Sequence, residues 1–280
     1  MEVIECPADM QSQAIQLRGR GKLLALVPTM GALHEGHLRL IDTARQRADV
    51  TVVSLFVNPT QFGPNEDLAK YPRDLEGDLE KCRQRGVDFV FAPPAERIYP
   101  PGFSTYVVEE SVGKRLEGES RPGHFRGVAT VVTILFHLCR PDVAVFGQKD
   151  AQQVAVIRRV VRDLWLPVEI VVAATVREAD GLAMSSRNAY LAPAERQEAA
   201  TLHAALQAGR ALVLQGITTP ERVRAEVMNR LRSSRCLRMI YVEIVHRDTM
   251  EPERVICTGQ SLIVAAVWLE RTRLIDNLAL

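Results

Sequence analysis

The sequence has almost no excess of charge of either sign. Among its 280 residues, 35 Lys and Arg stand against 34 Asp and Glu, so the formal net charge is +1. A protein that holds a long phosphate backbone needs a concentrated basic surface. The balance therefore argues against a nucleic-acid-binding protein, and it leaves open a local basic pocket for a small anion.

Cysteine is scarce and scattered. The sequence has an odd number of cysteines, widely spaced and without a Cys-x-x-Cys pair: Cys6, Cys82, Cys139, Cys236 and Cys257. This set indicates reduced thiols and argues against a disulfide framework or a structural zinc site. Reduced thiols are typical of cytoplasmic proteins, and we expect that location.

Long apolar runs are also missing. The longest, Val128–Cys139, is interrupted by polar residues and is shorter than the ~20 residues that cross a bilayer. The N-terminal segment MEVIECPADMQSQ carries acids and no apolar stretch of the signal-peptide type. We therefore expect a soluble protein with no membrane partner.

Glycine-rich phosphate motifs are absent. The sequence contains neither Gly-x-x-x-x-Gly-Lys-Ser/Thr nor Gly-x-Gly-x-x-Gly. Any nucleotide that binds this protein is therefore expected to bind without a glycine-rich cradle. Internal repeats and low-complexity segments are absent as well.

Strand-like and helix-like segments alternate over the first two-thirds of the chain. The strand-like segments are 22–28, 49–59, 87–94, 104–110, 141–147 and 167–176, and the helix-like segments are 37–48, 75–86, 127–139 and 150–164. The segment 127–139 is apolar on all sides and predicts a buried helix. Strands separated by helices predict βαβ crossovers and a mainly parallel sheet. Ligands of such sheets lie beyond the carboxyl ends of the strands.

The pattern changes near residue 175. A polar segment, READGLAMSSRNAYLAP, is followed by two helical segments, Pro193–Gln215 and Pro220–Ser233. Two strand-like segments, 239–247 and 261–270, come after them. This change from β-α-β to helix-helix-strand-strand predicts two domains, residues 1–175 and 176–280.

Two histidines, His34 and His37, stand where a strand passes through PTMG into a predicted helix. A lone histidine there would most simply cap or pack. Two on one helical face, after small residues, indicate a site for a phosphate whose negative charge grows in a transition state. Zinc is disfavoured, because zincin helices place the two histidines four residues apart and no third His or Cys lies nearby.

Two more cationic or hydroxylic segments fit a nucleotide. In FGQKD, Lys149 stands at a strand–helix junction where a cation can meet a polyphosphate, and Asp150 suits a helix N-cap. Taken alone, such a lysine would be a solvated side chain. MSSRN offers two hydroxyls and a guanidinium that could clamp phosphates, although alone it could be any turn.

Two other segments suit a smaller substrate. In NPTQF, Asn58 and Gln61 are neutral amides after a strand, suited to hydroxyl and carboxylate recognition. RPGHFRG supplies Arg121, His124 and Arg126 before the predicted buried helix. This composition predicts an anion-holding loop.

Five long motifs follow one another along the chain: PTMGALHEGHL, NPTQFGPNEDLAKYPR, SRPGHFRGVATVV, FGQKDAQQ and READGLAMSSRN. Together they resemble the pantothenate synthetase (pantoate–β-alanine ligase) family of the nucleotidylyl transferase superfamily. PTMGALHEGHL looks like that family's form of the His-x-x-His signature, which class I aminoacyl-tRNA synthetases share. The resemblance runs from about residue 20 to 190 and continues more weakly to the C-terminus. A lone His-x-x-His is a weak signal, whereas five long motifs in order are a strong one.

The resemblance implies an ATP-dependent ligase of pantothenate and coenzyme A biosynthesis. ATP and (R)-pantoate would form pantoyl adenylate and pyrophosphate, and the amine of β-alanine would then displace AMP to give pantothenate. Mg²⁺ would accompany the triphosphate. The implied fold is α/β, with a Rossmann-like parallel-sheet domain and a smaller C-terminal α+β domain acting as a lid, in a homodimer.

The resemblance also assigns roles by motif. The residues expected to contact ATP are Met30, Gly31, Ala32, Leu33, His34, Glu35, Gly36, His37, Gly147, Gln148, Lys149, Asp150, Val176, Met184, Ser185, Ser186 and Arg187. Among them, His37 as proton donor and His34, Lys149, Ser185, Ser186 and Arg187 form the expected catalytic set. The expected pantoate-binding residues are Gln61 and Gln153, helped by Asn58, with Arg121 near the gate of the site. No protein ligand of Mg²⁺ is assigned.

One residue departs from the family pattern. The motif usually contains Gly-Glu-Lys-Asp, whereas Gln148 stands here in place of the acid. This substitution suggests that the position contributes mainly through its backbone.

Three other functions share parts of this pattern. A nucleotide-cofactor adenylyltransferase would share the histidine pair but has no evident need for NPTQF and RPGHFRG together. A tRNA-binding synthetase module is disfavoured by the near-zero net charge. A non-catalytic nucleotide sensor stays open, because binding and catalytic residues coincide in this pattern.

Overall fold

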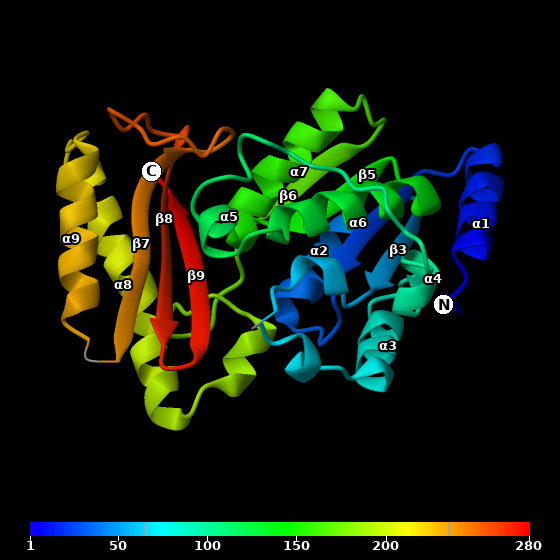
Figure 1. Ribbon diagram of the computed structural model, residues 1–280, viewed down its shortest axis with the longest axis horizontal. Coiled ribbons are helices and arrows are strands. Elements are labelled where there is room, and N and C mark those ends of the chain that lie inside the picture. Colours follow the sequence, from blue (N-terminus) through cyan, green and yellow to red (C-terminus); the bar gives the residue numbers. More distant parts are fainter. Residues whose placement is uncertain (65, 235) are drawn as a thin grey trace. The chain divides into compact units, whose positions relative to one another are not determined.

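The computed structural model describes residues 1–64, 66–234 and 236–280; Asn65, within the NPTQFGPNED segment, and Arg235 lie outside them. The chain forms two compact units, each with its own sheet (Figure 1). The first contains Met1–Gly147 and Val156–Ala173, and the second contains Gln148–Ala155 and Ala174–Leu280. Over the part of the chain so described, no helix is both long and apolar enough to cross a membrane.

The first unit is built on a parallel sheet. Its strands are β1 (Glu2–Ile4), β2 (Leu24–Thr29), β3 (Val50–Leu55), β4 (Phe89–Phe91), β5 (Val143–Gly147) and β6 (Glu169–Ala173). They lie in the order β1-β4-β3-β2-β5-β6, and every neighbouring pair is parallel. The chain runs outward in one direction from β2 and in the other from β5. The carboxyl ends of these two strands therefore mark the topological switch point, where ligands of such sheets bind.

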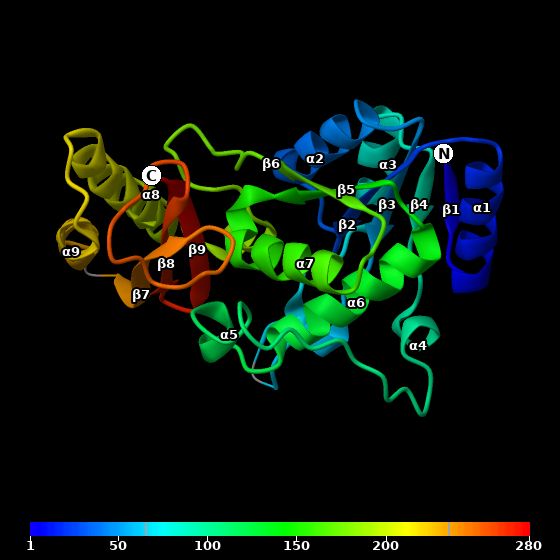
Figure 2. The same cartoon turned by 90° about the horizontal axis from the view of Figure 1, so that it is seen from above.

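Helices cover both faces of this sheet. On one face, α2 (Glu35–Arg45) and α3 (Leu75–Gln84) bury an apolar cluster that includes Ile41, Cys82 and Val27. On the other side lies α6 (His124–Cys139), which also contacts α1 (Pro7–Gly19) (Figure 2). The predicted buried helix is confirmed, because most residues of α6 are buried.

The second unit places two helices on an antiparallel sheet. The helices α8 (Pro193–Leu214) and α9 (Pro220–Arg232) pack on β7 (Leu237–His246), β8 (Ser261–Leu269) and β9 (Thr272–Ala279). The sheet order is β7-β8-β9. The core includes Leu206, Val227 and Ile263, all fully buried. The predicted fold class, a Rossmann-like parallel sheet with a smaller C-terminal α+β part, is confirmed.

Short elements carry several of the predicted site residues. One helix, α7 (Ala151–Asp163), begins in the second unit and ends in the first. The short helices are η1 (Pro59–Gln61), η2 (Leu68–Lys70), α4 (Ala95–Ile98), α5 (Glu117–Ser120), η3 (Gln148–Asp150) and η4 (Ser186–Tyr190).

The prediction of a strand at residues 104–110 is wrong. Its Val107 instead exchanges hydrogen bonds with the Thr130 hydroxyl of α6, which gives the extended segment a partner outside the sheet.

Apart from the short helices, the sequence prediction lacks β1, α1 and β9. Only Met10 and Ala14 of α1 are buried, so its sequence carries little apolar periodicity. In β9, Asp276 and Asn277 interrupt the apolar alternation that signals a strand. Both failures have the same cause, since a weak periodic pattern conceals an element that tertiary contacts stabilise.

A very close approach of helix and loop in the first unit occurs at Gly127 of α6. A Cβ there would lie 2.6 Å from the backbone N of Gln61 and closer still to the carbonyl O of Thr60. We expect Gly127→Ala to lower the free energy of unfolding by about 1–3 kcal/mol, because backbone atoms must move to admit the methyl group. Urea unfolding measures the change. Gly19→Ala, at the end of α1 with no atom within 4 Å of the added Cβ, is the matched control; an equal effect in both variants would contradict the prediction.

Candidate active site

The turn after β2 is held by an internal network. The Thr29 hydroxyl donates to the carbonyl O of Ser54 (2.8 Å) and accepts from the N–H of Gly31 (3.1 Å). Gly31 and Ala32 then both have positive φ, 82° and 50°. Such a pair of left-handed residues turns successive backbone N–H groups toward one point.

Asp78, on α3, occupies that point. Its two carboxylate oxygens accept the N–H groups of Ala32 and Leu33, each at 2.7 Å. Lys81, one turn further along α3, donates to the carbonyl O of Leu33 (2.8 Å). The Asp78 side chain is buried, and this burial raises the pKa of its carboxyl although the two N–H donors and Lys81 lower it. The N–H groups of Ala32 and Leu33 that could bind an anion therefore already bind the Asp78 carboxylate. A phosphate would have to bind to residues that follow this turn in the chain.

The two histidines follow directly and cap α2. The Nδ1 of His34, the N-cap residue, accepts the N–H of Gly36 (3.1 Å), and the Nδ1 of His37 accepts the N–H of His34 (3.4 Å). The ring centroids are 4.1 Å apart. Because each Nδ1 accepts, each ring carries its proton on Nε2. The arrangement thus fixes two N–H donors at the carboxyl end of β2. In the same turn, Glu35 pairs with Arg85 (3.5 Å).

Neutral amides assemble beside this turn. The Oε1 of Gln61 accepts from Nδ2 of Asn58 (3.0 Å), and its Nε2 lies 2.8 Å from the sulfur of Met30. The remaining atoms of Asn58 bind within the protein: Nδ2 to the carbonyl O of Gly127 (3.1 Å) and Oδ1 to the Tyr99 hydroxyl (2.8 Å). Asn58 is fully buried. It therefore fixes Gln61, and the structure brings Met30, Asn58 and Gln61 together.

Arg121 lies behind Gln61. Its guanidinium binds both carboxylate oxygens of Glu66 at 2.7 Å, and its NH2 lies 3.4 Å from the carbonyl O of Gln61. Burial alone would raise the pKa of the Glu66 carboxyl, but the Arg121 hydrogen bonds and charge outweigh burial and lower it. The charge of Arg121 is therefore largely balanced inside the protein.

His124 links Arg121 to the same carbonyl. Arg121 can only donate, so the Nε2 of His124 accepts from it (3.1 Å) and Nδ1–H donates to the carbonyl O of Gln61 (2.9 Å). Burial and the neighbouring guanidinium lower the pKa of His124 to about 4. Arg126 stacks on the ring of Tyr106, 3.6 Å from its centroid. The prediction of an anion-holding loop is thus not supported by these side chains: one is neutral, one is ion-paired and one is stacked.

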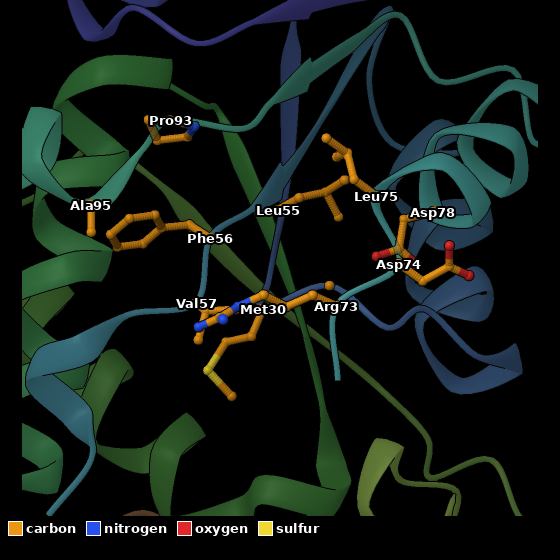
Figure 3. Close-up of a pocket in the computed structure, with 11 residues that line it drawn as sticks. Met30, Leu55, Phe56, Val57, Arg73, Asp74, Leu75, Asp78, Pro93 and Ala95 are labelled. Carbon is orange, nitrogen blue, oxygen red and sulfur yellow. The ribbon is translucent and has the colours of Figure 1, made fainter. Parts of the chain in front are cut away.

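A pocket opens in the first unit at the carboxyl ends of β2 and β3 (Figure 3). Its volume is about 310 Å³, enough for a small organic acid. Apolar side chains form most of its lining, with Met30, Phe56 and Pro93 among them. The charged lining residues are Arg73, Asp74 and Asp78. Of the predicted site residues, Met30 and Gly31 line it.

The FGQKD segment leads from β5 into α7. Gly147 ends β5, and Gln148–Asp150 form η3. Lys149 Nζ lies 3.4 Å from Asp150 Oδ1, and the Lys149 side chain is 21% exposed. The half-buried Gln153 lies in the first turn of α7. The side chain of Gln148 donates to Asn277, so this position contributes more than its backbone.

The segment that contains MSSRN is a folded-back loop. The Met184 N–H donates to the carbonyl O of Val176 (3.0 Å), and Arg177 pairs with Ala183 in a β-bridge. The Ser185 hydroxyl accepts the N–H of Arg187 (3.3 Å) at the start of η4, which also contains Ser186. The fold of this loop thus brings together Val176 and Met184, which are both predicted to contact ATP.

Ion pairs anchor this loop to α8 and β9. Arg196 of α8 binds the carboxylates of Glu178 and Asp180. Arg177 binds both oxygens of Asp276, at 2.6 and 2.9 Å, and His203 Nδ1 lies 3.6 Å from Asp276 Oδ2. Burial alone would raise the pKa of the Asp276 carboxyl, but His203 and Arg177 outweigh it and lower that pKa.

Several positioning residues were missed by sequence reasoning: Asp78, Tyr99, Asp276 and Asn277. Asp78 occupies an apolar position of its helix, since Leu75, Leu79 and Cys82 share its stripe at helical spacing. Asp276 and Asn277 stand inside the apolar strand LIDNLAL. A polar residue at a position that the pattern requires to be apolar is the signal that could have found them.

Replacing the Asp78 carboxylate by an amide tests its role as the anchor of the turn. Asparagine has one oxygen, so in Asp78→Asn the amide NH2 would face one of the two backbone N–H groups. Leaving a buried N–H unpaired costs about 1–3 kcal/mol, and we expect that loss in the free energy of unfolding. We also expect slower formation of the adenylate that the motif resemblance implies, since the histidine-bearing turn loses an anchor. The exposed Glu80→Gln on the same helix is the control; equal changes in both variants would argue against the anchor.

Burial of neutral His124 makes the free energy of unfolding depend on pH in the acid range. His124 has an ordinary pKa of 6.5 and a folded pKa of about 4, so between these values only the unfolded chain takes up the proton. Stability therefore falls as pH falls through this window, by up to about 3 kcal/mol. In His124→Gln this part of the loss should vanish. Urea unfolding at pH 7 and pH 4 measures it, and an unchanged pH dependence would refute the assignment.

Comparison with known proteins places these features in one family. The family model described as pantoate-beta-alanine ligase matches residues 2–279. The pantothenate synthetases of Moorella thermoacetica and Thermotoga petrophila are 51% and 50% identical, and each alignment covers at least 99% of both chains. The crystal structure of pantothenate synthetase from Thermus thermophilus is 44% identical, with a TM-score of 0.93 over 100% of this chain and 99% of that one.

A second solved structure adds ligands to the comparison. The pantoate-beta-alanine ligase of Francisella tularensis, solved in complex with beta-gamma ATP and β-alanine, is 31% identical. Its TM-score is 0.80, over 100% of this chain and 97% of that one. The full-length matches, together with the histidine pair at the switch point, show that the protein belongs to the pantoate–β-alanine ligase family.

Proposed function

We infer that the protein condenses (R)-pantoate with β-alanine to give pantothenate, using ATP and releasing AMP and pyrophosphate. The observation that carries this inference is family membership over the whole chain at about 50% identity to named pantothenate synthetases. The ligands of the Francisella tularensis relative, beta-gamma ATP and β-alanine, agree with two of the three substrates.

The reaction proceeds in two steps through pantoyl adenylate. A pantoate carboxylate oxygen attacks the α-phosphorus of ATP, a P–O bond forms, and pyrophosphate leaves. The neutral amine of β-alanine then attacks the acyl carbon, the C–O bond to AMP breaks, and a proton is released. Adenylation is needed because a free carboxylate resists attack by an amine. Holding both reactants side by side lowers the activation free energy further, because less translational and rotational entropy is lost on the way to the transition state.

His34 and His37 are proposed to stabilise the phosphate charge of the first step. Each has its Nδ1 engaged by a backbone N–H and therefore presents Nε2–H as a donor. Donors fixed in advance, at the place where charge develops, are worth about 10²–10³ in rate each. In this geometry a histidine can donate its Nε2 proton to a phosphate oxygen without changing its place.

Further residues are proposed to hold ATP. Lys149 would meet the phosphates, and the segment Met184–Arg187 would close over them. The other proposed contacts are Met30, Gly31, Ala32, Leu33, Glu35, Gly36, Gly147, Gln148, Asp150 and Val176. Within this set, the N–H groups of Ala32 and Leu33 are held by Asp78, so these two residues shape the turn more than they donate from it.

Magnesium is proposed to accompany ATP and to neutralise charge on its phosphates. In the residues that the structure describes, no group of three or more His, Cys, Asp or Glu could hold a metal ion. Mg²⁺ usually keeps several waters and is held largely through substrate phosphates.

Pantoate is proposed to bind through Gln61 and Gln153. The buried cluster supports this role for Gln61, because Asn58 fixes its side chain and Arg121 and His124 fix its carbonyl. A neutral amide suits a hydroxyl and a carboxylate without adding charge. Arg121 is proposed to guard the entrance while paired with Glu66.

We propose that residues 1–175 and 176–280 form the two domains, that the second acts as a lid, and that the enzyme is a cytoplasmic homodimer. A lid would serve the chemistry, because an acyl adenylate needs shelter from water.

Exchange of labelled pyrophosphate into ATP tests the proposed function. Adenylate formation needs only ATP, Mg²⁺ and pantoate, so exchange should occur without β-alanine. Oxygen-18 in the pantoate carboxylate should appear in AMP, because that oxygen stays bonded to phosphorus. AMP without the label, or exchange that requires β-alanine, would exclude a pantoyl adenylate formed first.

The same assay separates the alternatives. A nucleotide-cofactor adenylyltransferase or a tRNA-dependent module would show exchange only with its own acceptor in place of pantoate. A nucleotide sensor would bind ATP without forming AMP. Thiol reagents should spare the chemistry, because none of the five motifs contains a cysteine and because Cys82 and Cys139 are buried.

A further inference from the structure

The strand β9 contains two adjacent buried polar residues, Asp276 and Asn277, which are 3% and 4% exposed. Successive residues of a strand point to opposite faces of the sheet. Thr272, Leu274 and Asp276 follow the alternation of buried residues, and Asn277 breaks it. Asn277 is buried because η3 lies against β9 on its side.

The side-chain amide of Asn277 forms hydrogen bonds with η3 through both its oxygen and its nitrogen. Its Nδ2 donates to the carbonyl O atoms of Gln148 and Lys149, both at 2.9 Å, and its Oδ1 accepts from Nε2 of Gln148 (3.0 Å). The orientation of the amide is determined by this pattern, because only NH2 can face two carbonyl groups. Two consecutive carbonyl groups are therefore fixed by one side chain.

On the opposite face of the sheet, Asp276 holds the second predicted ATP-contacting segment in place. It binds the guanidinium of Arg177 through both oxygens, and Arg177 also donates to the carbonyl O of Gly181 (3.0 Å). His203 lies against Gly181 so closely that a Cβ at this glycine would overlap its ring. Arg177 stands next to Val176, at the base of the loop that leads to Ser185 and Arg187.

We propose that Asn277 is a positioning residue for adenylation, acting by fixing the Gln148–Lys149 backbone, and that β9 is the common anchor of both ATP-contacting segments of the second unit. The proposal rests on the proposed function, in which Lys149 and the 184–187 segment meet the phosphates. It assigns Asn277 no contact with substrate. Its effect runs through the placement of Lys149.

The consequence of losing Asn277 follows from the hydrogen bonds. Removing its amide takes one hydrogen bond from the carbonyl group of Gln148, one from that of Lys149 and one from the Gln148 amide, so η3 is free to shift. Misplacement of a reacting group by about 1 Å can cost 10²-fold in rate. The loss should fall on the step that uses Lys149, whereas attack of β-alanine on preformed pantoyl adenylate needs no pyrophosphate stabilisation.

Two measurements on Asn277→Ala test the proposal. Pyrophosphate exchange with ATP and pantoate should fall about 10- to 100-fold, while release of AMP from added pantoyl adenylate and β-alanine stays near the parent rate. Hydrogen–deuterium exchange should become faster in peptides that cover residues 148–151. Asn277→Ser, whose hydroxyl can donate to only one of the two carbonyl groups, should fall between parent and Asn277→Ala.

Two further variants complete the design. Thr272→Ala removes a buried polar group of the same strand, away from η3, and should change neither half-reaction. Combining Asn277→Ala with Lys149→Ala should be no slower than Lys149→Ala alone, because residues that act through one another are not additive. Additive losses, equal losses in both half-reactions, or unchanged hydrogen exchange at 148–151 would overturn the proposal. A parent protein without pantoate-dependent exchange would refute the proposed function instead, and hydrogen exchange would still decide whether Asn277 holds η3.

Discussion

The carboxylate of Asp78 is the interaction on which the histidine site depends. The turn after β2 needs two left-handed residues to bring the chain from the sheet into α2, and one of them, Ala32, is not a glycine. A non-glycine residue adopts that conformation only where the surroundings compensate its strain. Two short hydrogen bonds to a buried carboxylate supply the compensation. The helix cap, the tautomers of His34 and His37 and the direction of their Nε2 donors all follow from this turn.

Neutral amides play the corresponding part elsewhere in the molecule. Asn58 fixes Gln61 in the first unit, and Asn277 fixes Gln148 and Lys149 in the second. In both places the side chain is buried and its hydrogen-bonding groups are used inside the protein. Such residues give direction to their neighbours at no cost in charge burial, which would be high for an ion in the same place. The groups that these two amides position can then differ in charge while Asn58 and Asn277 themselves remain neutral.

The sequence was sufficient for the fold class and for most of the elements. The parallel strands β2, β3 and β5 are apolar and uninterrupted, and α6 is buried along most of its length, so their patterns are strong. The strand β9 and helix α1 could not be predicted, because their patterns are weak and tertiary contacts stabilise them. Motifs identified the residues proposed to face substrate, but not the supports Asp78 and Asn277. Those act across 45 and 128 residues of sequence, which a local pattern does not encode.

The hydrogen bonds by which Asn277 joins η3 to β9 all connect uncharged groups. Position 148 is a glutamine, and its partner Asn277 carries an amide as well. Bonds between uncharged groups do not titrate, and dissolved ions hardly screen them. The backbone of Lys149 should therefore keep its place across a range of acidity and ionic strength that alters every carboxylate and imidazole around it. A glutamate at position 148 would place a carboxylate oxygen against the Asn277 oxygen, which accepts a hydrogen bond from Gln148 here. The contact between η3 and β9 would then depend on whether that carboxylate is protonated, and hence on pH.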